Sequence, residues 1–97
     1  MLKFLILSKN KPSELNSVIK SIKKYCKINP ENYKISILYT YNNEHRNDYN
    51  ECIMNHLELD WQKETDFQKQ LLDNINTSDF IFLLNDNSVF TKEFQFI

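Results

Sequence analysis

Phe80-Ile81-Phe82-Leu83-Leu84-Asn85-Asp86-Asn87 is the stretch of this 97-residue chain that indicates the fold most clearly. Its first five residues form an uninterrupted apolar run of strand length, with turn-forming residues on both sides. Such a run is typical of a parallel strand whose two faces are both covered by helices. We therefore expect residues 80–84 to form a central, buried strand that ends in a polar loop. An edge strand or a helix at residues 80–84 would refute both this architecture and the placement of the site.

Three more strands are expected upstream of this run. Residues 2–8 are nearly continuous in apolar side chains, and residues 33–41 are rich in alternating β-branched and aromatic residues. Residues 57–61 alternate briefly, which indicates a short strand. Each strand is followed by a segment of different periodicity, so strands and helices are expected to alternate along the chain.

The intervening segments carry apolar residues at steps of three and four, which is the helical pattern. Helices are expected over residues 13–28, around residues 49–57 and after Thr65, where Gln68 three residues on has the form of a capping box. The expected inward faces are Leu15, Val18, Ile19, Ile22 and Cys26; Tyr49, Cys52, Ile53, His56 and Leu57; and Phe67, Leu71, Leu72 and Ile75.

This βαβαβαβ order predicts a single α/β domain over residues 1–97, with a mostly parallel sheet and helices on both faces. Its core should contain Ile6, Ile37, Phe82 and Leu84. The apolar ending Phe94-Gln95-Phe96-Ile97 resembles an interrupted element, and it is expected to fold back on the sheet or to meet a partner chain.

Composition excludes several classes of function. The chain contains no glycine, which rules out the glycine-rich dinucleotide fingerprint and the P-loop, because both need glycine where the backbone closes on phosphate. The net charge of −1 disfavours nucleic acid as a partner. The apolar run at residues 4–7 is too short to span a membrane and no cleavage site follows it, so a cytoplasmic protein without a transmembrane segment is expected. Cys26 and Cys52 are expected to be unpaired thiols.

Ligands in open α/β sheets bind beyond the carboxyl ends of the strands. That rule selects the loops at residues 8–11, 40–43, 62–64 and 85–88. The last loop stands out because Asp86, flanked by the amides of Asn85 and Asn87, supplies oxygen ligands that suit Mg²⁺ or Mn²⁺ bridged to phosphates. Asn and Asp are also common turn residues, so a simple turn remains an alternative at this position.

Three segments together resemble the family-2-like GT-A glycosyltransferases. They are Phe4-Leu5-Ile6-Leu7-Ser8 followed by Asn10-Lys11-Pro12 and a helix, the strand from Ile35 to Tyr41, and the run from Phe80 to Asn87. In that family the fourth strand ends in a DxD or DDx motif whose carboxylates hold a divalent metal against the diphosphate of a nucleotide-sugar. The resemblance implies a GT-A or Rossmann-like half-domain that binds a nucleotide-sugar donor with Mn²⁺ or Mg²⁺.

The resemblance implies a set of site residues. Asp86, Asn85 and Asn87 would hold the metal, and the donor would contact Ser8, Lys9, Asn10, Tyr41, Asn42 and Lys63, with Lys11 also near the diphosphate. The motif is degenerate, because amides replace carboxylates at Asn85 and Asn87 and weaken the attraction for a cation. The acidic residue that normally follows the second strand is also missing, which leaves amide hydrogen bonds or stacking by Tyr41 to meet the nucleoside.

Several of these residues also suit a purely structural role. An alternative for Lys9, Lys11 and Lys63 is that they are solvated lysines in loops. Core packing is the alternative to base stacking for Trp61 and Tyr39. Cys52 and His56 have metal-ligand spacing on one helical face, but His45 is the sole further nearby His or Cys for a zinc site.

Three functions remain open from the sequence. The first is a glycosyltransferase or its donor-binding half, in which case the chain is a fragment or truncated homologue whose acceptor-binding half is missing. The second is a non-catalytic α/β module that binds a nucleotide weakly or pairs with another subunit, such as a second copy, that completes the sheet. The third is a flavodoxin-like signalling domain, since fold does not fix function. In every case the 97-residue chain alone is expected not to transfer sugar, because little sequence follows the motif.

Overall fold

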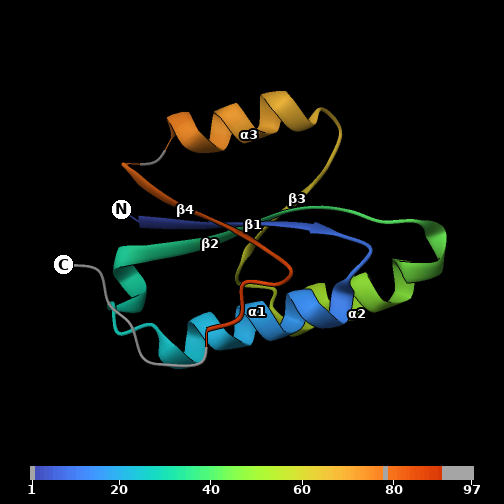
Figure 1. The fold of residues 1–97 in the computed structure, drawn as a ribbon, viewed down its shortest axis with the longest axis horizontal. Coiled ribbons are helices and arrows are strands. Elements are labelled where there is room, and N and C mark those ends of the chain that lie inside the picture. Colours follow the sequence, from blue (N-terminus) through green and yellow to red (C-terminus); the bar gives the residue numbers. More distant parts are fainter. Residues whose placement is uncertain (1, 78, 91–97) are drawn as a thin grey trace.

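A computed structural model describes residues 2–77 and 79–90 of the chain. Within them four strands alternate with three α-helices, and the strands form one parallel sheet in the order β3-β2-β1-β4. The elements are β1 (Leu2–Lys9), α1 (Pro12–Tyr25), β2 (Tyr33–Thr40), α2 (Arg46–Asn55), β3 (Asp60–Lys63), α3 (Phe67–Asn76) and β4 (Phe80–Asn85), with 3-10 turns at Pro30–Asn32 and Asn43–His45. Figure 1 shows α1 and α2 on one face of the sheet and α3 on the other. The predicted α/β fold with helices on both faces is confirmed.

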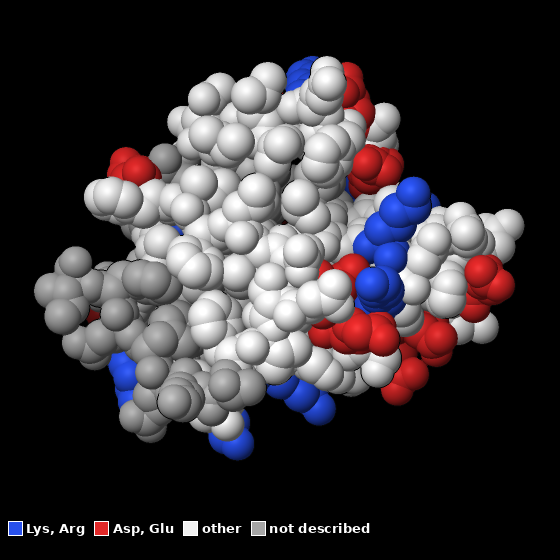
Figure 2. Space-filling view, in the orientation of Figure 1, with Lys and Arg blue, Asp and Glu red and all other residues white. Residues whose placement is uncertain are grey.

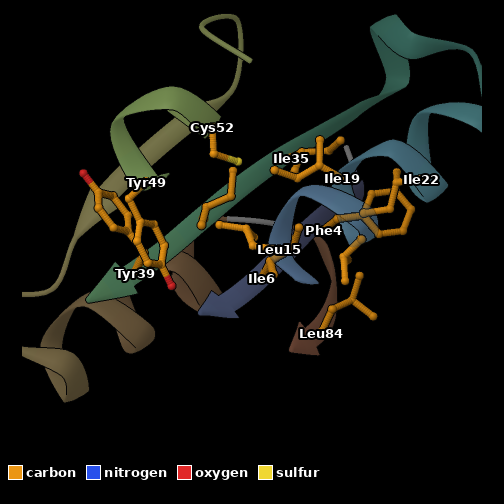
Figure 3. Close-up of a cluster of buried hydrophobic side chains, with 12 residues drawn as sticks. Phe4, Ile6, Leu15, Ile19, Ile22, Ile35, Tyr39, Tyr49, Cys52 and Leu84 are labelled. Carbon is orange, nitrogen blue, oxygen red and sulfur yellow. The ribbon is translucent and has the colours of Figure 1, made fainter. Parts of the chain in front are cut away.

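The main hydrophobic core lies between the sheet and the helices α1 and α2 (Figure 3). Alternate side chains of β1 and β2 point into it, because successive residues of a strand face opposite sides. The stripe predicted on α1 is buried at Leu15, Val18, Ile19 and Ile22. Ile6, Ile37 and Leu84 are buried as predicted, and Phe82 is partly buried against the same cluster. Full burial of side chains of this size contributes about 1.5–3 kcal/mol each.

The position predicted for the fourth strand is wrong. Among the described residues β4 pairs only with β1, so it is an edge strand, and Phe80 and Leu83 are 72% and 55% exposed. The interior strands are β1, which is bonded to β2 and β4, and β2, which is bonded to β1 and β3. A continuous apolar run is compatible with either position, because the number of neighbouring strands is decided by connections far away in the sequence. The parallel α/β architecture is nevertheless present, so an edge position does not refute it as expected, and the placement of the site has to rest on the geometry at the end of β4.

The inward face predicted for α3 is also wrong. The N-cap is Asp66, whose carboxylate accepts a hydrogen bond from the Lys69 N–H at 3.3 Å, so Thr65 and Gln68 do not form a capping box. Thr65 instead donates its backbone N–H to the side-chain oxygen of Gln70. Three of the four predicted inward residues, Phe67, Leu72 and Ile75, are exposed, and the fourth, Leu71, is only half-buried.

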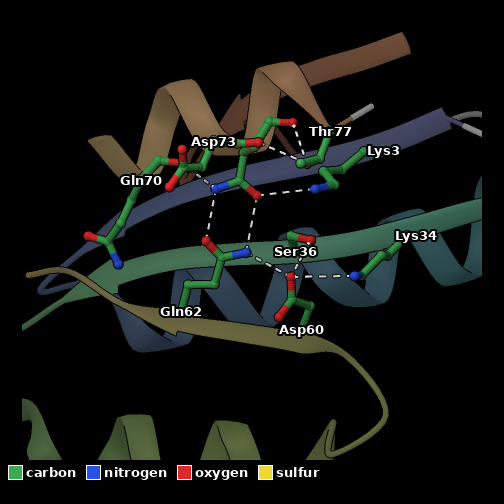
Figure 4. A network of polar contacts seen from close by, with 9 residues as sticks. Lys3, Lys34, Ser36, Asp60, Gln62, Gln70, Asp73 and Thr77 are labelled. Atoms are coloured by element: carbon green, nitrogen blue, oxygen red, sulfur yellow. Dashed lines mark hydrogen bonds and ion pairs between the residues drawn. The ribbon is translucent and has the colours of Figure 1, made fainter. Parts of the chain in front are cut away.

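A polar network lies beneath α3 (Figure 4), beside the buried Leu5 and Leu38, which point to this face of the sheet. Buried Asn74 exchanges two hydrogen bonds with Gln62 of β3, at 2.8 and 3.1 Å, and accepts a third from the Lys3 ammonium of β1 at 3.2 Å. Asp60 accepts hydrogen bonds from Gln62 and from Ser36 of β2. Directional bonds thus orient α3, which explains why its apolar residues point elsewhere.

Element ends differ from prediction near the second helix. α2 begins at Arg46 and ends at Asn55, so His56 and Leu57 follow it, and β3 begins at Asp60. His56 is buried as expected, but Leu57 is exposed, because the chain turns after the helix with the Leu59 N–H bonded to the His56 carbonyl. The predicted contact of the ending Phe94-Gln95-Phe96-Ile97 lies outside the described residues.

Candidate functional site

The strand order creates a switch point between β1 and β4. After β1, the next two strands, β2 and β3, lie on one side of β1, and β4 lies on its other side. In open α/β sheets the loops diverge at such a point and leave a crevice beyond the carboxyl ends of the strands. Figure 2 shows basic and acidic side chains gathered together toward this end of the molecule.

A cleft of about 420 Å³ lies at this switch point. Its walls come from the ends of β1, β2 and β4 and from the segment that leads into α3. Six lining residues were singled out from the sequence, namely Ser8, Lys9, Lys11, Asn85, Asp86 and Asn87. Six were not singled out as donor or metal ligands, namely Leu7, Leu38, Tyr39, Thr40, Glu64 and Phe67. The loops after β1 and β4, 77 residues apart at Lys9 and Asp86, therefore share one cleft.

Asp86 is the residue that joins the two loops. It is 7% exposed, and its Oδ2 accepts a hydrogen bond from the backbone N–H of Lys9 at 3.2 Å. Its Oδ1 is buried and has no hydrogen-bond partner among the described residues. Burial raises the pKa of this carboxyl, while the nearby Ser8 hydroxyl and the Lys9 N–H oppose the rise. An unpartnered buried carboxylate oxygen costs free energy, so its retention is typical of a functional position.

Asn85 and Asn87 take part in a turn rather than opening toward a ligand. The Asn85 Oδ1 accepts hydrogen bonds from the Asn87 N–H at 2.8 Å and from the Ser88 hydroxyl at 3.3 Å. The Ser88 N–H closes the turn on the Asn85 carbonyl at 3.1 Å. The side-chain oxygen of Asn85 is therefore already used, and the turn interpretation describes this loop well.

The described residues of this loop provide too few ligands for a divalent cation. Within residues 2–77 and 79–90 no three His, Cys, Asp or Glu side chains lie together in a metal-binding arrangement. Asp86 is the one carboxylate of the motif, its Oδ1 is enclosed, and its Oδ2 is already hydrogen-bonded. The described side chains do not build a complete cation site, because Mg²⁺ and Mn²⁺ require about six oxygen ligands.

Asn10 and Asn42 brace the loop between β1 and α1 and do not line the cleft. Asn10 has a positive φ of 54°, a left-handed conformation that Asn tolerates better than most residues. Its Oδ1 accepts the Asn42 N–H at 2.7 Å, and its own N–H donates to the Thr40 carbonyl at 3.3 Å. The two amides thus hold the loop in place by contacts with the end of β2.

Tyr49 of α2 is the residue that sequence reasoning missed. Its side chain is fully buried, its hydroxyl lies 2.8 Å from the Ser8 Oγ, and it accepts the backbone N–H of Lys11 at 3.0 Å. Burial raises the pKa of this phenol. The sequence placed Tyr49 only on an apolar helix face, although a buried tyrosine hydroxyl normally finds a partner and so pointed to a polar neighbour.

Tyr41 and Lys63 lie beside the cleft but do not line it. The Tyr41 ring stacks on Tyr49 at a centroid distance of 5.1 Å, and the Lys63 ammonium lies 4.9 Å from the Tyr41 ring centroid. Tyr39 also stacks on Tyr41, at 6.1 Å. Neighbouring protein groups thus occupy the place where a base was expected to stack. Trp61 packs edge-on against Tyr39 and donates its indole N–H to the His56 carbonyl, in agreement with a core role.

The alternative zinc site is not formed by the described side chains. Both ring nitrogens of His56 have partners, the Lys23 ammonium and the Asn16 side-chain oxygen, each at 2.8 Å. Burial raises the pKa of the Cys52 thiol to about 11, which opposes the thiolate that zinc requires.

The chain matches no protein-family model, no curated protein and no solved structure. No helix in the part of the chain that the structure describes is both long and apolar enough to cross a membrane. The geometry of the cleft is therefore the basis for any functional inference.

Proposed function

We propose that the cleft between the ends of β1 and β4 binds the diphosphate of a nucleotide-sugar, and that the chain is the donor-binding part of a glycosyltransferase-like protein. Asp86 carries this proposal, because it is the buried carboxylate at the switch point, bonded to the Lys9 N–H and retaining an unpartnered oxygen. The cleft lies where open α/β sheets bind nucleotides. The cleft also lies at the end of β4, whose sequence up to Asn87 resembles the strand and metal motif of family-2-like GT-A glycosyltransferases.

The proposed roles follow from the lining groups. Lys9 and Lys11 supply positive charge for phosphate oxygens, a role that falls to side chains in a chain without glycine loops. The Ser8 hydroxyl, held by Tyr49, is available at the same wall. Mn²⁺ or Mg²⁺ is suggested by the family resemblance alone, since Asp86 is the one carboxylate that the motif offers, so the binding test compares samples with and without metal.

The same geometry favours binding over turnover. Amide groups stand where the family has carboxylates, and the Asn85 oxygen is committed to its turn. A second candidate is accordingly a non-catalytic module that binds a nucleotide weakly or assembles with a partner. We also propose a cytoplasmic location, which is supported by the two unpaired thiols Cys26 and Cys52, because free thiols are usual in a reducing compartment.

Titration calorimetry with uridine diphosphate and other nucleoside diphosphates, with Mn²⁺ or with a chelator, tests the binding proposal. Asp86→Ala should weaken binding at least tenfold, about 1.4 kcal/mol. Asp48→Ala is the matched control, because Asp48 is an exposed aspartate on α2 outside the cleft. Unchanged affinity in a folded Asp86→Ala variant would refute the assignment.

A turnover assay with a panel of nucleotide-sugars separates the two candidates. The chain alone should neither transfer sugar nor hydrolyse the donor, because transfer also requires an acceptor held in line with the anomeric carbon. Turnover above a no-protein control, abolished by Asp86→Ala, would show a complete enzyme instead.

A further inference from the structure

The outer edge of β4 is uncovered by the described part of the chain. β4 pairs with β1 on one side, and within residues 2–77 and 79–90 no strand pairs with the other. After the strand, the chain turns toward α1, where the Phe90 N–H donates to the Ser21 hydroxyl at 3.0 Å. An edge strand presents a row of backbone donors and acceptors that can template pairing with another strand.

β4 also lacks the features that normally protect an edge. The strand Phe80–Asn85 contains no charged residue and no proline, and its Phe80 and Leu83 side chains are largely exposed. α3, which leads into β4, adds exposed Leu72 and Ile75. Figure 2 shows an almost uncharged surface over the middle of this region. Short apolar strands without charge are the segments most prone to pair.

We propose that the edge of β4 pairs antiparallel with β4 of a second copy of this chain, joining two sheets across a two-fold axis. Charge supports a second copy as the occupant, because a two-fold axis places each strand against itself and an uncharged strand meets no like charge.

Surface area indicates the strength of this dimer. Leu72, Ile75, Phe80 and Leu83 expose on the order of 400 Å² in each copy, so the roughly 800 Å² that two copies could bury falls below the roughly 1,000 Å² of a stable interface. The dimer is therefore weak and concentration-dependent.

Sedimentation equilibrium over a micromolar concentration series tests the pairing, with hydrogen exchange of the β4 amides as a second readout. The wild-type mass should rise from monomer to dimer, and exchange of the β4 amides should slow in parallel. Leu83→Lys should weaken dimerisation about tenfold or more, because a lysine on the edge disfavours pairing. The matched control is Leu57→Lys, since Leu57 is 64% exposed but lies between α2 and β3.

Three outcomes would overturn the proposal. They are a wild-type monomer at every concentration, equal weakening by Leu57→Lys and Leu83→Lys, and a dimer whose β4 amides exchange as fast as in the monomer. If Leu83→Lys fails to fold by circular dichroism, Phe80→Lys replaces it, because Phe80 is the more exposed of the two.

Discussion

The two faces of the sheet are built on different physical principles. Beneath α1 and α2 the side chains of Phe4, Ile6 and Ile37 are fully buried among apolar neighbours. Beneath α3 the contact at the centre is a network of amides, a lysine and an aspartate around buried Asn74. Apolar packing is strong and tolerant of small shifts, whereas hydrogen bonds fix one orientation. The first face therefore supplies most of the stability, and the second sets where α3 lies.

The largest expected effect comes from breaking the apolar face. Ile19→Ala should lower the free energy of unfolding by about 2–5 kcal/mol, because it leaves a cavity in the core. Leu72→Ala on α3 should change it by less than about 0.5 kcal/mol, since that side chain is exposed. Urea denaturation of both variants measures the difference. Equal losses would contradict the comparison.

Removing one member of the polar network should have an intermediate effect. Asn74→Ala removes the hydrogen-bond partner of the Gln62 side-chain oxygen and of the Lys3 ammonium, at a cost of about 1–3 kcal/mol, while the Gln62 amide keeps its bond to Asp60. In a double-mutant cycle with Gln62→Ala, the two losses should be non-additive by about 0.5–3 kcal/mol. Additive losses would show that the two amides do not act as a unit.

Tyr49→Phe tests the hydrogen bonds that connect the apolar core to the loop beside the cleft. The ring and its packing are retained, but Ser8 and Lys11 lose a hydrogen-bond partner, so the expected loss is about 1–2 kcal/mol. Tyr25→Phe, near the end of α1, is the control and should be close to neutral. If nucleotide binds as proposed, Tyr49→Phe should also weaken it, and a calorimetric titration would show this.

The smallest effects are the pH dependences of Asp60 and Asp86, and they should have opposite signs. Burial alone would raise the pKa of Asp60, but hydrogen bonds from Gln62 and Ser36, with Lys34 and Lys3 nearby, lower it. Its contribution to stability is therefore present above the unfolded pKa and is lost as pH falls through the folded pKa. Burial raises the pKa of Asp86, so its contribution is present at low pH and is lost as pH rises.

Thermal melts of two amide variants test those signs. Asp60→Asn should have a lower Tm than wild type at pH 7, and Asp86→Asn a higher one. The Asp86→Asn difference should shrink as pH falls below the unfolded pKa, whereas the Asp60→Asn difference should persist until pH falls through the lowered folded pKa of Asp60. A higher Tm for Asp60→Asn at pH 7 would contradict the role of the network.

The sequence alone identified much of the site's location but not its internal arrangement. Ser8, Lys9 and Asp86 line one cleft because parallel strands end at the same edge of a sheet, a rule that needs only the strand positions. The rule does not say which loop residues face inward, so Asn10, Asn42 and Tyr41 were assigned to a ligand that they do not face. Tyr49 reaches the site from a helix 41 residues away from Ser8, a distance over which local patterns carry no information.

The sequence by itself determined the alternation of strands and helices, the buried stripe of α1 and the absence of glycine-built phosphate loops. These follow from periodicity and residue type, which act over a few neighbouring residues. Only the tertiary structure decided that β1 and β2 are the interior strands, that β4 lies at an edge, and that α3 turns Asn74 toward the sheet. The neighbours of a strand depend on which segments, distant in the sequence, pair with it. The face that a helix turns to the sheet depends on the side chains that the sheet presents to it. An apolar run therefore predicts a strand without predicting how many partners that strand has.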